Sequence, residues 1–117
     1  MGMIEELKDL GVNVDEALKR LNNNTSFYER MLRSVPGMLE KDPVKTDFDA
    51  NDYGEVLEKA HALKGATGNL SLTPLYQAYT DIVALLREGK PEEARKILID
   101  VQPVQQEIID AINKYPA

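Results

Sequence analysis

The chain contains no cysteine, no tryptophan and a single histidine among its 117 residues. The lack of cysteine excludes disulfides, thiolate catalysis and zinc sites built on cysteine ligands. A single histidine likewise excludes a metal site that needs several imidazoles. Carboxylates are plentiful, but no segment combines spaced Asp or Asn ligands with a turn glycine and a closing Glu, which is the pattern of a calcium loop. We therefore expect the chain to bind no metal and no cofactor.

Long apolar runs and an excess of basic residues are also missing. No run approaches the roughly 18 apolar residues of a membrane span, and residues 1–8 lack the basic flank and apolar block of a secretory signal. The formal net charge is −6, whereas nucleic acids and anionic membranes attract basic surfaces. We expect a cytoplasmic protein that binds neither nucleic acid nor membrane. For so small a domain we expect a monomer.

What the sequence does contain is the composition of one soluble globular domain. Hydrophobic residues make up 43% of the chain and charged residues 29%, and both fractions are ordinary for such domains. A chain of this length needs only one hydrophobic core, and no linker, repeat or low-complexity tract divides it. Residues 1–117 are thus expected to form a single domain.

Helix signals dominate, and strand signals are nearly absent, since no run alternates apolar and polar residues and no Asn-Gly or Asp-Gly turn occurs. Gly11 and Gly89 stand where glycines end helices. Pro74 and Pro91 stand where prolines begin them. We expect short helices over 4–10 and about 16–21, and longer helices over 26–39, 52–70, 73–89 and 91–112. Four long helices joined by short turns imply an all-α, antiparallel (up-down) four-helix bundle with the short N-terminal helices packed on it.

Caps and prolines refine these boundaries. Asp52 is the expected N-cap of the histidine-containing helix, with Glu55 three residues later completing a capping-box-like pair. Pro36 is expected to kink or end early the helix in which it lies, and Pro103 to bend the last helix. Residues 40–51, which contain several aspartates and little periodicity, are expected to form a long surface loop or a single helical turn.

The lone histidine, His61, lies in the 52–70 helix, and the spacing of its neighbours indicates which way it faces. Residues advance 100° each around a helix. The apolar sector that must face the core lies away from His61 and holds Tyr53, Val56, Ala60, Leu63, Thr67 and Leu70. Within about 60° of His61 lie Gly54, Leu57, Glu58, Lys64, Gly65 and Gly68. His61 is therefore expected to be exposed, beside a cation, a hydrophobe and glycines.

Two glycines inside one helix cost about 1 kcal/mol each relative to alanine, so their place beside His61 needs a reason. Gly65 and Gly68 would leave room for an anion or a partner protein to approach the imidazole. An exposed imidazole is largely neutral at cytoplasmic pH, and its free ring nitrogen is a nucleophile toward an activated phosphoryl group. Lys64, one turn further on, would neutralise charge on the phosphoryl oxygens. Leu57 would offer a partner an apolar contact.

The same residues also allow plainer interpretations. A lone histidine on a helix surface is most often a solvated residue, and a lysine three positions later adds little by itself. Gly68 could mark an early end of the helix, and Leu57 could contact an N-terminal helix. Both alternatives stay open on the sequence alone.

The stretch His-Ala-Leu-Lys-Gly at 61–65, followed by Ala-Thr-Gly-Asn-Leu at 66–70, closely resembles the signature of histidine-containing phosphotransfer (HPt) domains. The Leu-Thr-Pro-Leu segment at 72–75 and the opening segment 10–18 also resemble small stand-alone bacterial members. The resemblance covers most of the chain. Members of that family are four-helix bundles that relay phosphoryl groups between the aspartates of response-regulator receiver domains.

By that resemblance, His61 would be the phosphoacceptor, Lys64 the cation that faces the phosphate, and Gly65 the small residue that admits the phosphoryl group. The chain would not be an enzyme by itself, because it has no Gly-rich nucleotide loop and no complete metal site. The acidic Mg²⁺ pocket that the transfer needs would come from the receiver domain. The implied partners are a response-regulator receiver domain, a hybrid histidine kinase, or both.

The implied partner surface is the exposed face of the histidine-containing helix, with part of the helix that follows. On that face it includes Leu57, Glu58 and Gly68. Two positions depart from the family pattern: Ser71 stands where glycine is usual after the helix, and Val83 replaces a common acidic residue. These departures concern the turn geometry and the partner surface, not the phosphoacceptor.

Two further functions fit the same residues. In the first, the chain is a phosphoacceptor domain from a larger protein, and a chemotaxis-type kinase phosphorylates His61 directly. In the second, the chain is a helical adaptor that binds partners through the same face and is never phosphorylated. No motif in the chain names the cognate kinase or regulator, or the direction in which the phosphoryl group flows.

Overall fold

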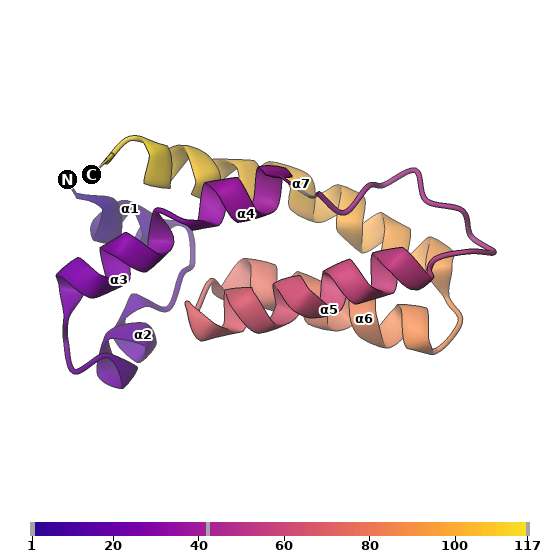
Figure 1. Ribbon diagram of the computed structural model, residues 1–117, viewed down its shortest axis with the longest axis horizontal. Coiled ribbons are helices and arrows are strands. Elements are labelled where there is room, and N and C mark those ends of the chain that lie inside the picture. The colour runs from indigo at the N-terminus through magenta and orange to yellow at the C-terminus, as the bar shows by residue number, and fades with distance from the viewer. Residues whose placement is uncertain (1, 42, 117) are drawn as a thin grey trace.

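Seven α-helices and their connections make up the part of the chain that the computed structural model describes, residues 2–41 and 43–116 (Figure 1). The helices are α1 (Met3–Asp9), α2 (Val14–Arg20), α3 (Thr25–Leu32), α4 (Val35–Lys41), α5 (Gly54–Asn69), α6 (Thr73–Arg87) and α7 (Pro91–Asn113). Among these residues the one extended pairing is an isolated bridge between Asp49 and Asp52. The expectation of an all-helical protein is therefore confirmed.

The three longest helices define the arrangement of the molecule. α6 lies between α5 and α7 and packs on both, while α1 and α4 pack on α7. The short connections at 70–72 and 88–90 make each consecutive pair a helical hairpin. The molecule measures 44 × 24 × 21 Å, with α1, α2 and α3 gathered at one end of its long axis, where both chain ends also lie (Figure 1).

Apolar residues from all seven helices form one core. Two large tyrosines are buried in it, and each hydroxyl has a partner, as buried polar groups require. The Tyr28 hydroxyl donates to the carbonyl oxygen of Leu70 at 2.7 Å. The Tyr79 hydroxyl donates to Oε1 of Gln105 at 2.6 Å. The first of these bonds ties α3 to the residue that ends α5, the helix that carries the histidine.

The 26–39 helix expected from the sequence is two helices, α3 and α4. The chain leaves the helix at Arg33 and Ser34 and resumes it at Val35. Pro36 explains the interruption, because a proline ring clashes with the carbonyl group four residues earlier and has no N–H to donate. It lies in the first turn of α4, where neither property disturbs the helix. The kink or early end expected from Pro36 is confirmed as a break just before it.

The N-cap predicted for α5 is wrong. The helix begins at Gly54, its cap residue is Tyr53, and no side chain caps its first N–H groups. Asp52 instead pairs with Asp49 in the isolated bridge, where its N–H donates to the Asp49 carbonyl oxygen at 3.0 Å. Aspartate favours turns as well as helix caps, and here the turn forms.

Glycine and proline mark the other helix ends as predicted. Gly11 and Gly89 have φ values of +91° and +75°, left-handed conformations that glycine adopts without a clash from a side chain. Pro91 is the first residue of α7, and Pro74 lies in the first turn of α6. α7 continues through Pro103, and the local bend expected there stays a prediction.

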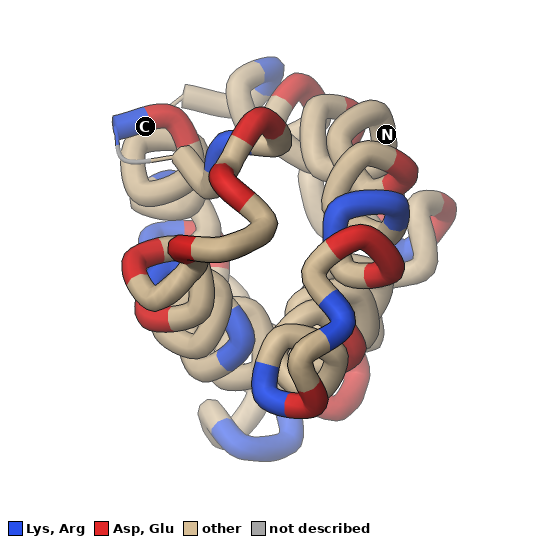
Figure 2. The backbone as a smooth tube through the Cα atoms, turned by 90° about the vertical axis from the view of Figure 1, so that its right-hand side faces the viewer, with Lys and Arg blue, Asp and Glu red and all other residues tan. Residues whose placement is uncertain are grey.

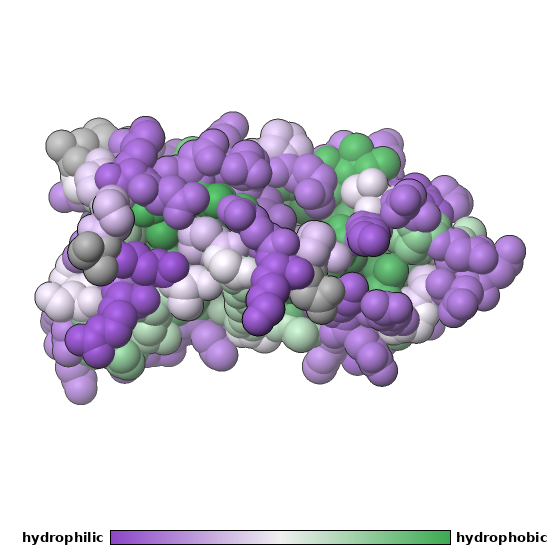
Figure 3. Space-filling model, turned by 45° about the horizontal axis from the view of Figure 1, so that its top comes forward, coloured by the Kyte–Doolittle hydropathy of each residue, from purple (hydrophilic) through white to green (hydrophobic). Residues whose placement is uncertain are grey.

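Acidic and basic residues are mixed over the surface. Figure 2 shows both kinds interspersed along the backbone, in a chain with a formal net charge of −6. On the face drawn in Figure 3, hydrophilic residues surround smaller hydrophobic areas. In the described part of the chain, no helix has both the length and the apolar composition needed to cross a bilayer.

Candidate functional site

The face of α5 that carries His61 points outward, as the spacing predicts. His61 is exposed, whereas the inward positions Val56, Ala60, Leu63 and Thr67 are buried. Thr67 is polar, but its Oγ1 donates to the Leu63 carbonyl oxygen at 2.7 Å, so the buried hydroxyl is satisfied. The predicted division of α5 into a core face and an exposed face is confirmed.

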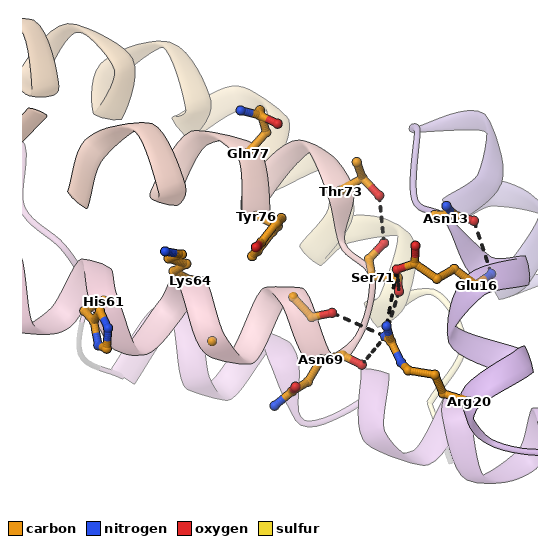
Figure 4. A pocket seen from close by; sticks show the side chains of 12 residues that line it. Asn13, Glu16, Arg20, His61, Lys64, Asn69, Ser71, Thr73, Tyr76 and Gln77 are labelled. Carbon is orange, nitrogen blue, oxygen red and sulfur yellow. Dashed lines mark hydrogen bonds and ion pairs between the residues drawn. The ribbon is translucent and has the colours of Figure 1, made fainter. Parts of the chain in front are cut away.

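A groove of about 600 Å³ opens beside His61, between α5, α6 and the end of α2 (Figure 4). Most of the predicted site residues line it: His61, Lys64, Gly65 and Gly68. Arg20 of α2 and Tyr76 of α6 line it from the other helices. The structure thus brings the predicted phosphate-facing residues into one concave site, and it leaves Leu57 and Glu58 outside it.

The side chains of His61 and Lys64 are uncommitted in this groove. Within residues 2–41 and 43–116, no hydrogen bond or ion pair engages either of them. They project from neighbouring turns of α5 (Figure 4). The other lysine of α5, Lys59, contrasts with Lys64 because its Nζ lies 3.2 Å from Oε1 of Glu55. Lys64 is therefore the α5 cation that can meet an incoming anion beside the imidazole.

The two glycines on this face have different surroundings. A Cβ atom built at Gly65 would meet no heavy atom within 4 Å beyond its own helix, so packing inside the protein does not require a glycine there. A Cβ atom at Gly68 would lie 2.9 Å from two ring atoms of Tyr76, closer than carbon atoms pack. Gly68 therefore lets the Tyr76 ring of α6 lie against α5, whereas Gly65 leaves open space beside His61.

The end of α5 is held by α2. Arg20 Nη2 donates to the carbonyl oxygens of Gly68 and Asn69, at 3.3 and 2.8 Å. Such terminal carbonyls lack partners within their helix and attract a positive charge. The same nitrogen donates to Ser71 Oγ at 2.8 Å, and Ser71 Oγ donates to Glu16 Oε1 at 2.8 Å. The network joins α2 to the turn between α5 and α6 (Figure 4).

The structure accounts for both departures from the HPt pattern. Ser71 has a φ of +54°, a left-handed conformation that glycine adopts most easily. The serine hydroxyl offsets the strain through its bonds to Arg20 and Glu16. Val83 is 2% exposed. It therefore belongs to the core, and the concern that it alters the partner surface is not supported.

Leu57 and Glu58 lie on α5 outside the groove. Leu57 is half-buried and packs against the core, so only part of its side chain can face a partner. Glu58 is exposed. The assignment of both residues to a partner surface stays a prediction.

Arg20 and Tyr76 are groove residues to which the sequence pattern does not point. Tyr76 does leave a signal, because the short connection at 70–72 makes α5 and α6 a hairpin. Positions within the last turns of α5 and the first turns of α6 then lie close together, as Gly68 and Tyr76 do. Arg20 leaves none, since it lies 48 positions before Gly68 and no local pattern links the two.

Metal-binding groups and comparisons with known proteins were the two remaining sources of information about this site. In the described ranges, no group of three or more His, Cys, Asp or Glu side chains could hold a metal ion. Comparisons with protein-family models, with curated proteins and with solved structures found no match. The resemblance to HPt domains therefore depends on the sequence alone, at residues 61–70, 72–75 and 10–18.

Proposed function

We propose that the chain is a histidine phosphotransfer protein, in which His61 accepts a phosphoryl group from a receiver-domain aspartate and donates it to another. In this role it is an intermediate of a two-component phosphorelay and not an enzyme by itself. We also propose the finer fold, an antiparallel four-helix bundle formed by α3 with α4, α5, α6 and α7. A cytoplasmic, monomeric protein fits this role, because receiver domains must reach the exposed groove.

The observation that carries the proposal is the arrangement at the start of the groove. An exposed imidazole, an uncommitted ammonium group and a glycine without neighbours lie within one turn of α5: His61, Lys64 and Gly65. Gly65 lowers the stability of the helix, and no packing contact inside the protein requires a glycine there. Space for a phosphoryl group beside the imidazole gives a reason for it.

The transfer step balances with the residues at hand and one partner. The unprotonated ring nitrogen of His61 attacks phosphorus, and an N–P bond forms as the bond from phosphorus to the aspartate oxygen breaks. The aspartate leaves as a carboxylate of the receiver domain. Lys64 would stabilise the charge on the three phosphoryl oxygens during transfer. Donation to a second receiver domain reverses the same bond changes.

Incubation with receiver domains that carry a radiolabelled phosphoryl group tests the proposal. The wild type should acquire label from at least one of the host's receivers, and the label should be labile to acid and stable to alkali, as phosphohistidine is. His61→Gln should acquire none. Because His61 is exposed, this substitution should leave the helical circular dichroism and the melting temperature unchanged, which makes it a clean control.

Each other outcome is informative. Absence of label on the wild type with every receiver, or undiminished label on His61→Gln, would contradict the proposal. Label that comes only from a kinase and ATP would favour a phosphoacceptor domain served directly by a kinase. Partner binding that ignores replacement of His61, together with no phosphohistidine in cells, would favour an unphosphorylated adaptor.

A further inference from the structure

Tyr76 is an exposed aromatic residue inside the groove. Three large hydrophobic side chains are exposed in the described part of the chain: Phe27 at 41%, Tyr76 at 40% and Ile99 at 51%. Phe27 and Ile99 lie on α3 and α7 and do not line the groove. Tyr76 therefore combines an exposed aromatic surface with a position in the groove that His61 also lines.

The Tyr76 ring is held in place before any partner arrives. It lies so close to Gly68 that a Cβ atom there would be 2.9 Å from ring atoms Cδ1 and Cε1. The side of the ring that carries these two atoms thus lies against α5 at Gly68, while 40% of the residue is exposed. A side chain that is already ordered loses less conformational entropy on docking than a mobile one.

The charges around Tyr76 favour an acidic partner surface. Lys64 and Arg20 line the same groove, and Arg20 reaches Glu16 and Ser71 with its side chain still 47% exposed. Glu16, the acidic residue of the groove lining, is paired with Arg20, so the groove still carries an excess of positive charge in a chain of net charge −6. A surface with carboxylates around an apolar recess would meet both the cations and the ring.

We propose that Tyr76 anchors the docking of the receiver domain that exchanges the phosphoryl group with His61. The ring, seated on Gly68, inserts into an apolar recess of that receiver, and carboxylates around the recess face Lys64 and Arg20. This inference rests on the proposed function and extends it to a residue that takes no part in the chemistry. Tyrosine suits such a position, because it buries a large area and its hydroxyl keeps a hydrogen-bonding group at the rim.

The test compares Tyr76→Ala with Phe27→Ala, which removes an aromatic ring of equal exposure from α3. The receiver's Kd is measured by titration, and the rate of transfer within the saturated complex is measured by single turnover. Tyr76→Ala should raise the Kd about tenfold and leave the saturated transfer rate within about twofold of wild type. Phe27→Ala should change neither quantity.

A second variant tests the seat of the ring without removing it. In Gly68→Ala the added methyl group must displace the Tyr76 ring, so the Kd should rise in the same direction. The free energy of unfolding reports whether either variant disturbs the fold. Labelling of His61 by phosphoramidate, a small donor that needs no docking, should proceed at the wild-type rate in Tyr76→Ala.

The outcomes separate this inference from the function on which it rests. If the wild type exchanges phosphoryl groups with a receiver but Tyr76→Ala binds it as tightly, Tyr76 is not the anchor and the function stands. The inference is equally overturned if Tyr76→Ala slows only the saturated transfer rate. If the wild type neither binds nor exchanges with any receiver, both are overturned.

Discussion

At the scale of single residues, spacing predicted which face of α5 is exposed. The positions of His61, Lys64 and Gly65 follow from 100° steps around α5, and the groove brings them together. The same spacing could not predict that Gly65 and Gly68 have different surroundings. The reason for Gly68 is a ring from α6, which is a tertiary contact, whereas Gly65 has no such contact and keeps its functional interpretation.

Gly65→Leu is expected to slow phosphoryl transfer without unfolding the protein. The new side chain would fill the open space beside His61 and displace the phosphoryl group, and misplacement by about 1 Å can lower a rate roughly 100-fold. Stability should not fall, because no atom outside the helix lies within 4 Å of the added Cβ. Leucine also has a higher helix propensity than glycine. Single-turnover rates and thermal melts measure the two effects.

Gly37→Leu is the matched control for this substitution. Gly37 is also exposed, lies in α4, and has no neighbour within 4 Å of an added Cβ, but it does not line the groove. Its replacement should leave the transfer rate at the wild-type value. Equal rates for Gly65→Leu and the wild type would remove the steric argument.

At the scale of elements, the sequence predicted which helices exist better than where they begin and end. Helical spacing identifies an apolar face, but a boundary depends on competition among local bonds. Pro36 separates α3 from α4 through a clash that spacing does not register. Asp52 could form similar hydrogen bonds as a helix cap or in a turn. In the structure it pairs with Asp49 and forms the turn.

The contact between α2 and the end of α5 also lies beyond any local pattern, and Arg20→Ala tests its strength. The variant loses the bonds to Ser71 and to the terminal carbonyls of α5. Because the guanidinium is partly exposed, we expect a loss of about 1–2 kcal/mol in the free energy of unfolding. Urea denaturation measures it.

Lys19→Ala serves as the control for Arg20→Ala. Lys19 is an exposed basic residue in the same last turn of α2, so its removal tests the general effect of losing a positive charge there. Its cost should stay within about 0.5 kcal/mol. If the two variants lose equal stability, the network at the turn does not hold α2 in place.

At the scale of the whole molecule, two buried tyrosines connect different helices through side-chain hydrogen bonds. Tyr28 of α3 binds the carbonyl oxygen of Leu70, and Tyr79 of α6 binds Gln105 of α7. Burial raises the pKa of Tyr79 from 10.0 to about 12. Burial raises the pKa of Tyr28 to about 12 as well, although the positive charge of Arg20 acts in the opposite direction.

These raised pKa values predict that the fold loses stability in alkali. Below pH 10 both the folded and the unfolded protein keep the phenolic protons, and the full stability is present. Between pH 10 and 12 the unfolded chain releases protons that folded Tyr28 and Tyr79 retain, so the free energy of unfolding falls as pH rises. A difference of this size corresponds to a loss of at most roughly 2 kcal/mol per tyrosine by pH 12, where the folded phenols are themselves half ionised.

Circular dichroism and tyrosinate absorbance, followed together from pH 9 to 12, should therefore show ionisation of the buried tyrosines coincident with loss of helix. Tyr79→Phe isolates one of them, because it removes the ionisable hydroxyl and leaves Gln105 without that donor. The variant should be about 1 kcal/mol less stable at neutral pH and should lose less stability between pH 10 and 12 than the wild type. An identical alkaline decline in both proteins would show that Tyr79 does not couple ionisation to unfolding.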